Sequence, residues 1–224
     1  MWVPVRDGSD PHGTPFESFP QTPPPHRLDG ITVATTQRTR RKTLDPAFTI
    51  PGLDVGDGAA TARLLQGRLV ALLDLSLTLK HIHWNVVGPT FIGVHTMLDP
   101  QVDAVQAMID RTAERIATLG ASPNGLPGAL VNARDWDDYS LMRASTLEHL
   151  GALDLVYTGV IESHRATIDE LEELDLVSQD MVIGQAAQLE QFHWFVRAHL
   201  ESPDGRLATA GATTERQAAA RSRD

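Results

Sequence analysis

The sequence predicts an all-α protein, a four-helix bundle with a long crossover that carries a short helix between the second and third helices. Apolar residues return every three or four positions in four long segments, and no segment shows the alternation that marks a β-strand. Helices of roughly 25 residues would each be about 37 Å long, which matches a four-helix bundle. The connection between the second and third segments is the longest, so the crossover belongs there.

The first two helices are expected at about residues 57–86 and 91–119. A leucine stripe that begins at Leu65 marks the first helix, and the glycine–proline pair at residues 88–89 should end it. Gly120 should close the second helix, because glycine tolerates the left-handed conformation that is common after a helix C-terminus.

The crossover and the last two helices follow. Residues 135–139 are expected to form the short helix of the crossover. Ser145 and Glu148 make a capping box, in which each side chain bonds a backbone N–H of the other residue, so the third helix should start there. Ser178 is expected to cap the fourth helix, whose apolar face ends at Leu200.

These helices occupy one domain, residues 46–201, between two tails. Residues 1–45 hold seven prolines and no apolar periodicity, so they are expected to be disordered. A start site assigned too far upstream is an alternative explanation of this segment. Residues 202–224 are rich in alanine, threonine, glycine and arginine, and we expect a flexible second tail with almost nothing to bury.

The composition excludes several classes of protein. The chain has no cysteine, which excludes a disulfide framework, thiolate catalysis and sulfur-ligated zinc and leaves histidine and carboxylate groups as metal ligands. No apolar run approaches the roughly 18 residues of a membrane helix, and the N-terminus lacks a signal-peptide pattern, so we expect a cytoplasmic protein. The net charge of -10 argues against a globally basic nucleic-acid binder and favours cations as partners.

Potential metal ligands lie at the end of the first helix and along the second. His83 ends the first helix. His95 and Asp99 are four residues apart on the second helix, as are Asp110 and Glu114, so each pair shares a helix face. Any one of these residues alone is more often a solvated or core side chain, so spacing by itself leaves metal binding open.

The axial distance between the two pairs bears on assembly. Asp99 and Asp110 are eleven residues apart, about 16 Å along the axis, so one chain cannot bring both to a single ion. Either the pairs form unrelated sites, or two chains share one. If the second helix packs antiparallel against its copy near residue 105, two identical sites result. Their mixed imidazole and carboxylate ligands would suit Fe(II) and its oxidation better than zinc.

Three stretches resemble the signature of Dps, the DNA-binding protein from starved cells, a family of ferritin-like miniferritins. They are residues 79–88, with His83-Trp84-Asn85, residues 91–99 and residues 110–115, and the similarity extends from about Phe48 to Glu201, with residues 136–139 and Phe195 included. The resemblance implies a shell of twelve subunits with ferroxidase sites at two-fold interfaces, which oxidises Fe(II) with hydrogen peroxide as the favoured oxidant. It also implies that a ferric mineral is stored inside and that DNA is protected from oxidative damage.

The resemblance also implies which residues hold the iron. His83, His95 and Asp99 match the family's ligands from one subunit. Asp110 and Glu114 match the ligands from the partner subunit. Every matched position holds the residue type that is typical of the family.

One aromatic residue and an acidic cluster are further candidates. Trp84, beside His83, could act as a sacrificial electron donor, although a buried aromatic in a bundle is the commoner interpretation. The acidic residues at the junction of the third and fourth helices fit a solvated helix end. The family's acidic pore implies instead that Glu172, Asp175 and Asp180 line a three-fold channel that concentrates Fe(II).

A basic cluster lies in the first tail. Its residues Arg38, Arg40, Arg41 and Lys42 could bind DNA phosphates, and twelve copies on one shell would add avidity. A solubilising basic run is the other interpretation, since residues 1–45 hold six positive and five negative side chains. The alternative function is therefore a nucleoid-associated, nucleoid-compacting DNA-binding protein whose metal chemistry is secondary.

Other histidines fit no complete ligand pattern. Glu190 and His193 have the Glu-x-x-His spacing of larger di-iron bundles, but those bundles need two such motifs. Both residues lie off the apolar stripe of the fourth helix, so we expect them on the surface. His149 and His164 have no patterned partner at all.

Overall fold

The computed structural model of the chain describes residues 46–223, and the structural statements below refer to this range. Residues 1–45 and Asp224 lie outside the described residues. The expected disordered tail, its basic cluster and the start-site alternative therefore stay predictions. No helix within residues 46–223 is both long enough and apolar enough to cross a bilayer.

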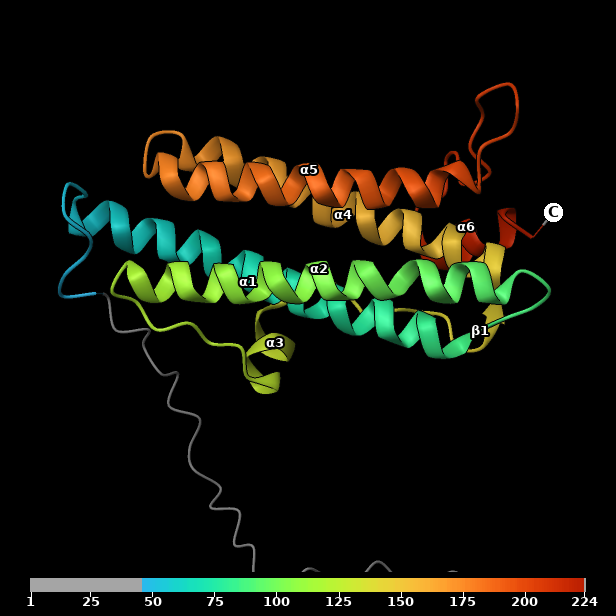
Figure 1. Cartoon of the computed structure of the whole chain (residues 1–224), viewed down its shortest axis with the longest axis horizontal. Helices are drawn as coiled ribbons and strands as arrows, with labels where there is room; N and C mark the ends of the chain where they lie inside the picture. The colour runs from blue at the N-terminus through green and yellow to red at the C-terminus, as the bar shows by residue number, and fades with distance from the viewer. Residues whose placement is uncertain (1–45, 224) are drawn as a thin grey trace, which may run out of the picture. The chain divides into compact units, whose positions relative to one another are not determined.

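Four long helices form the bundle, as the sequence predicts. They are α1 (Val55–Asn85), α2 (Phe91–Thr118), α4 (Thr146–Leu171) and α5 (Leu176–Ala198). α1 and α2 pack as one antiparallel pair, and α4 and α5 form a second pair (Figure 1). The long crossover connects α2 to α4, so the predicted architecture is confirmed.

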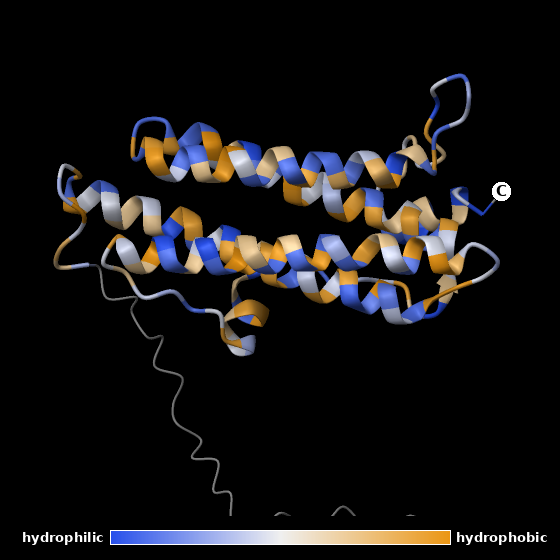
Figure 2. Cartoon of the chain, in the orientation of Figure 1, coloured by the Kyte–Doolittle hydropathy of each residue, from blue (hydrophilic) through white to orange (hydrophobic). Residues whose placement is uncertain are grey.

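The core lies where the two helix pairs meet. One cluster of buried apolar side chains includes Leu79, Leu153 and Tyr157, and a second includes Leu65 and Leu119. Apolar and polar bands alternate along each long helix in Figure 2, as in helices with one buried face. Full burial of one such side chain contributes about 1.5–3 kcal/mol, so these clusters hold the helices together.

Two predicted helix ends are confirmed. The Glu148 carboxylate accepts a hydrogen bond from the Ser145 N–H at 3.0 Å, and the Ser145 side chain accepts one from the Glu148 N–H, so the capping box starts α4. Gly120 has a φ of 84°, the left-handed conformation expected after α2. A Cβ at this position would also collide with the carbonyl oxygen of Phe48. Glycine therefore lets the segment before α1 pass close to the end of α2.

The start of α5 differs from the prediction. Asp175 caps the helix, and its carboxylate oxygens accept hydrogen bonds from the N–H groups of Val177 and Ser178 at 3.3 and 3.2 Å. Ser178, the expected cap, is instead buried in the first turn. That turn also carries two exposed apolar residues, Leu176 and Val177, so apolar periodicity does not reveal where the helix begins.

The short helix of the crossover lies earlier than expected. It is α3 (Pro127–Ala133), and residues 135–139 are not helical. Proline at the first helical position favours a helix start, because its missing N–H would lack a helical partner in any case. The later segment is held by its side chains instead: Trp136 donates from Nε1 to Asp74 of α1 at 2.8 Å.

A pair of two-residue strands, which the sequence does not predict, links the α1–α2 turn to the start of α4. β1 (Val86–Val87) runs parallel to β2 (Ala144–Ser145). Segments of two residues show no periodicity, so a sequence pattern cannot reveal them. The strand pair holds the end of α1, where His83 lies, beside the start of α4.

The C-terminal segment folds onto the bundle, which corrects the expectation of a flexible tail. α6 (Glu215–Arg221) packs against α4 and buries Ala218 and Ala219. The approach is close, because a Cβ on Gly151 of α4 would lie 2.8 Å from the carbonyl oxygen of Ala218. Small side chains form this contact, so the sequence shows no stripe of large apolar residues that would predict it.

Candidate metal site

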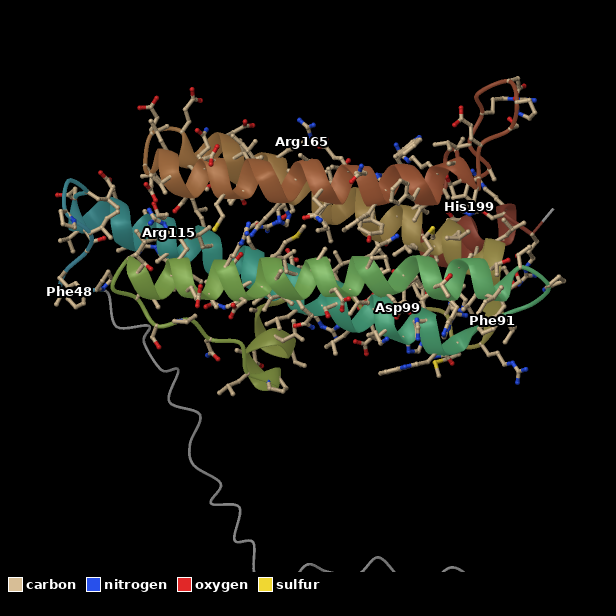
Figure 3. All side chains as sticks on the ribbon, viewed as in Figure 1. Phe48, Phe91, Asp99, Arg115, Arg165 and His199 are labelled. Carbon is tan, nitrogen blue, oxygen red and sulfur yellow. The ribbon has the colours of Figure 1, made fainter. Side chains whose placement is uncertain are left out.

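His83 and His95 meet at the end of the bundle where α1 turns into α2. His83 lies in the last turn of α1, and His95 lies near the start of α2. Their imidazole rings stack, with centroids 3.6 Å apart and planes inclined at 26°. The ring centroid of Phe91 lies 5.0 Å from that of His95, and Figure 3 shows Phe91 at the same end of α2 as Asp99. The short turn between the helices thus brings two predicted ligands into contact.

Hydrogen bonds to backbone carbonyl groups determine which ring nitrogen of each histidine carries a proton. Nδ1 of His83 lies 3.1 Å from the carbonyl oxygen of His95, and Nδ1 of His95 lies 2.9 Å from the carbonyl oxygen of His83. A carbonyl oxygen only accepts hydrogen bonds, so each Nδ1 carries the proton and donates it. In a neutral ring the lone pair is then on Nε2. Metal-binding histidines commonly have this arrangement, with one ring nitrogen anchored and the other open.

Asp99 lies beside this histidine pair but is engaged elsewhere. Its Oδ1 is 3.3 Å from Nδ1 of His83 and 3.5 Å from Nζ of Lys80. The Asp99 side chain is 51% exposed, so it is free to change rotamer. A cation bound at Nε2 of the histidines would compete with Lys80 for this carboxylate.

Asp110 and Glu114 lie far from these residues within one chain. Both are exposed on α2, and eleven residues, about 16 Å along the axis, separate Asp110 from Asp99. Within residues 46–223, no group of three or more histidine, aspartate and glutamate side chains has an arrangement that could hold a metal. The five predicted ligands therefore form two separate groups in a single chain.

Trp84 is on the surface of the single chain, which corrects the interpretation as a buried aromatic. Its side chain is 71% exposed, and Leu77, two turns earlier on α1, is 62% exposed. Ile92 at the start of α2 is also exposed. Nζ of Lys80 lies 6.0 Å from the Trp84 ring. An apolar surface thus borders the histidine pair.

The predicted pore residues differ in their surroundings. Glu172 and Asp180 are exposed around the α4–α5 turn. Asp175 is buried, and a guanidinium nitrogen of Arg115 lies 2.6 Å from its Oδ2. Burial alone would raise the pKa of Asp175, but hydrogen bonds from Ser178 and Arg115 outweigh it and lower that pKa. The Asp175 carboxylate is thus paired within the chain.

Sequence reasoning missed a buried polar group around Asp154. This carboxylate of α4 accepts hydrogen bonds from His193 at 2.6 Å, Arg197 at 2.7 Å and Thr209 at 2.6 Å. His193 is therefore buried, not on the surface as expected. Glu190 was also expected on the surface, and its side chain is partly exposed and forms an ion pair with Arg165. An acidic residue next to the apolar stripe of the third predicted helix is the signal that would have revealed the group.

The chain is similar to known proteins by a family model, by sequence and by structure. A family model described as a ferritin-like domain matches residues 62–204. The chain is 58% identical over 177 residues to the "DNA protection during starvation protein" of Mycolicibacterium smegmatis, which covers 79% of this chain and 97% of the relative. It is 50% identical to the "Fine tangled pili major subunit" of Haemophilus ducreyi, over 71% of this chain and 84% of the relative. The solved structure of DpsA14 from Streptomyces coelicolor matches with a TM-score of 0.73 and 56% identity, over 74% of this chain and 99% of that chain.

Proposed function

The chain belongs to the ferritin-like Dps family, and from this premise we propose that it oxidises Fe(II) at sites shared by two copies of the chain. Hydrogen peroxide is the preferred oxidant in this proposal. The Fe(III) product is stored as a mineral inside a shell of twelve subunits, and the removal of iron and peroxide protects DNA. The protein would act in the cytoplasm.

The observation that carries the proposal is the reciprocal hydrogen bonding of His83 and His95. Each ring is anchored through Nδ1 to the other residue's backbone, so two Nε2 lone pairs are available without further rearrangement. Rotation of Asp99 away from Lys80 adds a carboxylate oxygen. This mixed nitrogen and oxygen ligand set suits Fe(II) as a substrate that binds, reacts and leaves.

The partner chain would complete the site. The midpoint between His95 and Glu114 falls between residues 104 and 105 of α2. The midpoint between Asp99 and Asp110 falls at the same place. A single two-fold axis at this midpoint therefore places Asp110 and Glu114 of one copy opposite Asp99 and His95 of the other. The exposed Leu77, Trp84 and Ile92 supply apolar area for such an interface.

The reaction needs two Fe(II) ions for each peroxide. Each Fe(II) gives one electron, the O–O bond breaks, and two hydroxide ions form with two Fe(III) ions. The ligands hold the ions and the carboxylates balance their charge, so the protein's contribution is to bring both electrons to one peroxide. Trp84, at the edge of this site, is the proposed sacrificial electron donor.

Substitution of the histidines tests the proposal. We expect His83→Ala and His95→Ala to lose most of the peroxide-dependent oxidation of Fe(II), measured by the absorbance of Fe(III). His199→Ala is the matched control, because His199 is exposed on the last turn of the bundle, as Figure 3 shows. Oxidation at the parental rate in both site variants would refute the assignment.

A route for the substrate is part of the proposal. Glu172 and Asp180 are two of the exposed carboxylates near the α4–α5 turn, and three copies of them would attract cations to an opening. Asp175 would act there as the helix cap that positions the turn. We expect Glu172→Gln with Asp180→Asn to slow uptake of Fe(II) while the final amount of iron per shell stays the same.

DNA binding is the second candidate function, because the name of the Mycolicibacterium smegmatis relative refers to the protection of DNA and the first tail of this chain carries a basic cluster. The basic cluster Arg38, Arg40, Arg41 and Lys42 is the proposed contact, whereas part of the C-terminal segment is already packed on α4. A gel-shift assay at low and physiological salt would compare the full chain with chains that lack residues 1–45 or 202–224. If DNA binding is unchanged after each of the two truncations, neither tail is the DNA-binding segment.

A further inference from the structure

A cavity of about 740 Å³ lies between α1, the crossover, α4 and the start of α6. Small-molecule sites in proteins usually have volumes of roughly 300–1,000 Å³. The Ser140 N–H of the crossover donates a hydrogen bond at 2.6 Å to the Glu215 carboxylate of α6. Nε1 of Trp136, also in the crossover, donates to Asp74 of α1 at 2.8 Å. These hydrogen bonds hold three of the four walls together, so the cavity does not depend on a ligand.

Apolar side chains supply one part of the lining. Leu75 of α1 is buried, and Leu155, Val156 and Val160 of α4 are partly buried. A small inorganic cation such as Mg²⁺ keeps much of its hydration water and gains nothing from such a surface. Methylene groups are stabilised there, because their apolar surface is removed from water. The lining therefore favours a ligand with a hydrocarbon part.

Negative charge dominates the rest of the lining. Six carboxylates line the cavity, and the one lysine or arginine among the lining residues is Arg216. Three of the carboxylates bond to groups of the protein, as Glu215 does with the Ser140 N–H. The other three have no hydrogen-bond or ion-pair partner within residues 46–223: Asp135, Asp137 and Glu162. Unpaired carboxylates beside an apolar surface favour an organic cation over an anion.

Two further groups of the lining suit a protonated amine. Oγ of Ser140 is buried and has no hydrogen-bond partner in the part of the chain that the structure describes. A hydroxyl oxygen can accept a hydrogen bond from an ammonium group, and an unused buried acceptor costs free energy. The indole of Trp136 also lines the cavity, and its bond to Asp74 fixes its position. Ammonium groups are attracted to the face of an indole ring.

We propose that this cavity binds an aliphatic polyamine. The methylene chain lies on the leucine and valine side chains, and the ammonium groups pair with the unpaired carboxylates. Asp135 and Asp137 belong to the crossover and Glu162 belongs to α4, so a ligand with charges at both ends of a chain reaches carboxylates on two walls. Bound polyamine links the crossover to α4. The site does not depend on iron and thus goes beyond the proposed function.

Isothermal titration calorimetry of the full-length protein, with spermidine as the probe, tests the site. We expect one spermidine per chain. Asp135→Asn combined with Asp137→Asn should weaken binding by roughly threefold to tenfold, because partly exposed ion pairs contribute modestly. Asp169→Asn combined with Glu173→Gln is the matched control. It removes the same charge from two exposed carboxylates that do not line the cavity, so binding should stay at the parental strength.

A series of diamines separates the cavity from a general attraction of cations. The series runs from 1,3-diaminopropane to 1,6-diaminohexane, whose members carry the same charge near neutral pH and differ in methylene number. We expect the affinity to rise with each added methylene group, because more apolar surface is buried. An equal concentration of Mg²⁺ should leave spermidine bound.

Several results would overturn the inference. Affinity that is independent of chain length, or displacement of spermidine by an equal concentration of Mg²⁺, would mean that the probe only neutralises surface charge. An equal loss of binding in the cavity variant and the control variant would have the same meaning. A parent protein that binds no spermidine would also contradict the site. None of these results bears on the oxidation of Fe(II), which is measured separately.

Discussion

At the residue scale, Asp154 joins three parts of the chain. Burial alone would raise its pKa, but hydrogen bonds from His193, Thr209 and Arg197 lower that pKa to about 2. A lowered pKa stabilises the folded protein above the pKa of the unfolded carboxyl, and this contribution is lost as the pH falls toward the folded pKa. The stability that Asp154 provides should therefore decline between about pH 4 and pH 2.

We predict that Asp154→Asn lowers the free energy of unfolding near neutral pH by about 3 kcal/mol, because it leaves charged groups without their buried partner. The variant should also lose less stability than the parent between about pH 4 and pH 2. Urea unfolding at several pH values measures both effects. Glu162→Gln is the control, since Glu162 is exposed on the same helix and should change stability by less than about 0.5 kcal/mol. Equal effects of the two substitutions would contradict the account.

Lys80 and the substrate ion compete for one carboxylate. Lys80 is 3.5 Å from Asp99, and such partly exposed pairs contribute about 0.2–1 kcal/mol. We predict that Lys80→Gln tightens the binding of Fe(II) by up to about fivefold, as measured by anaerobic titration. Weaker binding in the variant would mean that Lys80 holds Asp99 in place for the ion.

At the element scale, the docking of α6 depends on a glycine. A Cβ on Gly151 would approach the Ala218 carbonyl oxygen and the Ser222 hydroxyl, whereas a Cβ on Gly159 of the same helix meets nothing within 4 Å. We predict that Gly151→Ala destabilises the protein by about 1–3 kcal/mol and exposes residues 202–223 to proteolysis. Gly159→Ala should stabilise it by about 0.5–1 kcal/mol. The same protease sensitivity in both variants would contradict this prediction.

The long helices could be predicted from the sequence, whereas the short elements could not. The long helices bury one face each, so apolar spacing reveals them. The short helix α3 depends on a proline at its start, and α6 depends on the close approach of its Ala218 carbonyl and Ser222 side chain to Gly151. β1 and β2 are too short to show a pattern. Each of these elements is stabilised by tertiary contacts that periodicity does not record.

The candidate site shows the same division. Spacing along α2 predicts which residues share a face and that one chain cannot gather all five ligands. It does not predict that His83 and His95 anchor each other's rings, since this depends on the turn between α1 and α2. It also misses the cavity between the crossover and α4, because residues from four separate parts of the chain line it.

At the scale of the whole molecule, the account requires an assembly. Twelve copies of the 24.4 kDa chain would have a mass of roughly 290 kDa, which light scattering or sedimentation can measure. We predict this mass for the full chain in solution. A monomer that oxidises Fe(II) at the full rate would contradict the shared site.

The most direct test of the shared site is complementation between two inactive variants. One chain carries His83→Ala and keeps Asp110 and Glu114, and the other carries Glu114→Ala and keeps His83 and His95. In a mixed dimer, one of the two sites takes all its ligands from the intact halves of both chains, so random mixing restores about a quarter of the sites. We predict that co-expressed variants regain peroxide-dependent Fe(II) oxidation to about that fraction of the parental rate, although each variant alone is inactive. Activity that stays at the level of the separate variants would contradict the claim that two chains build the site.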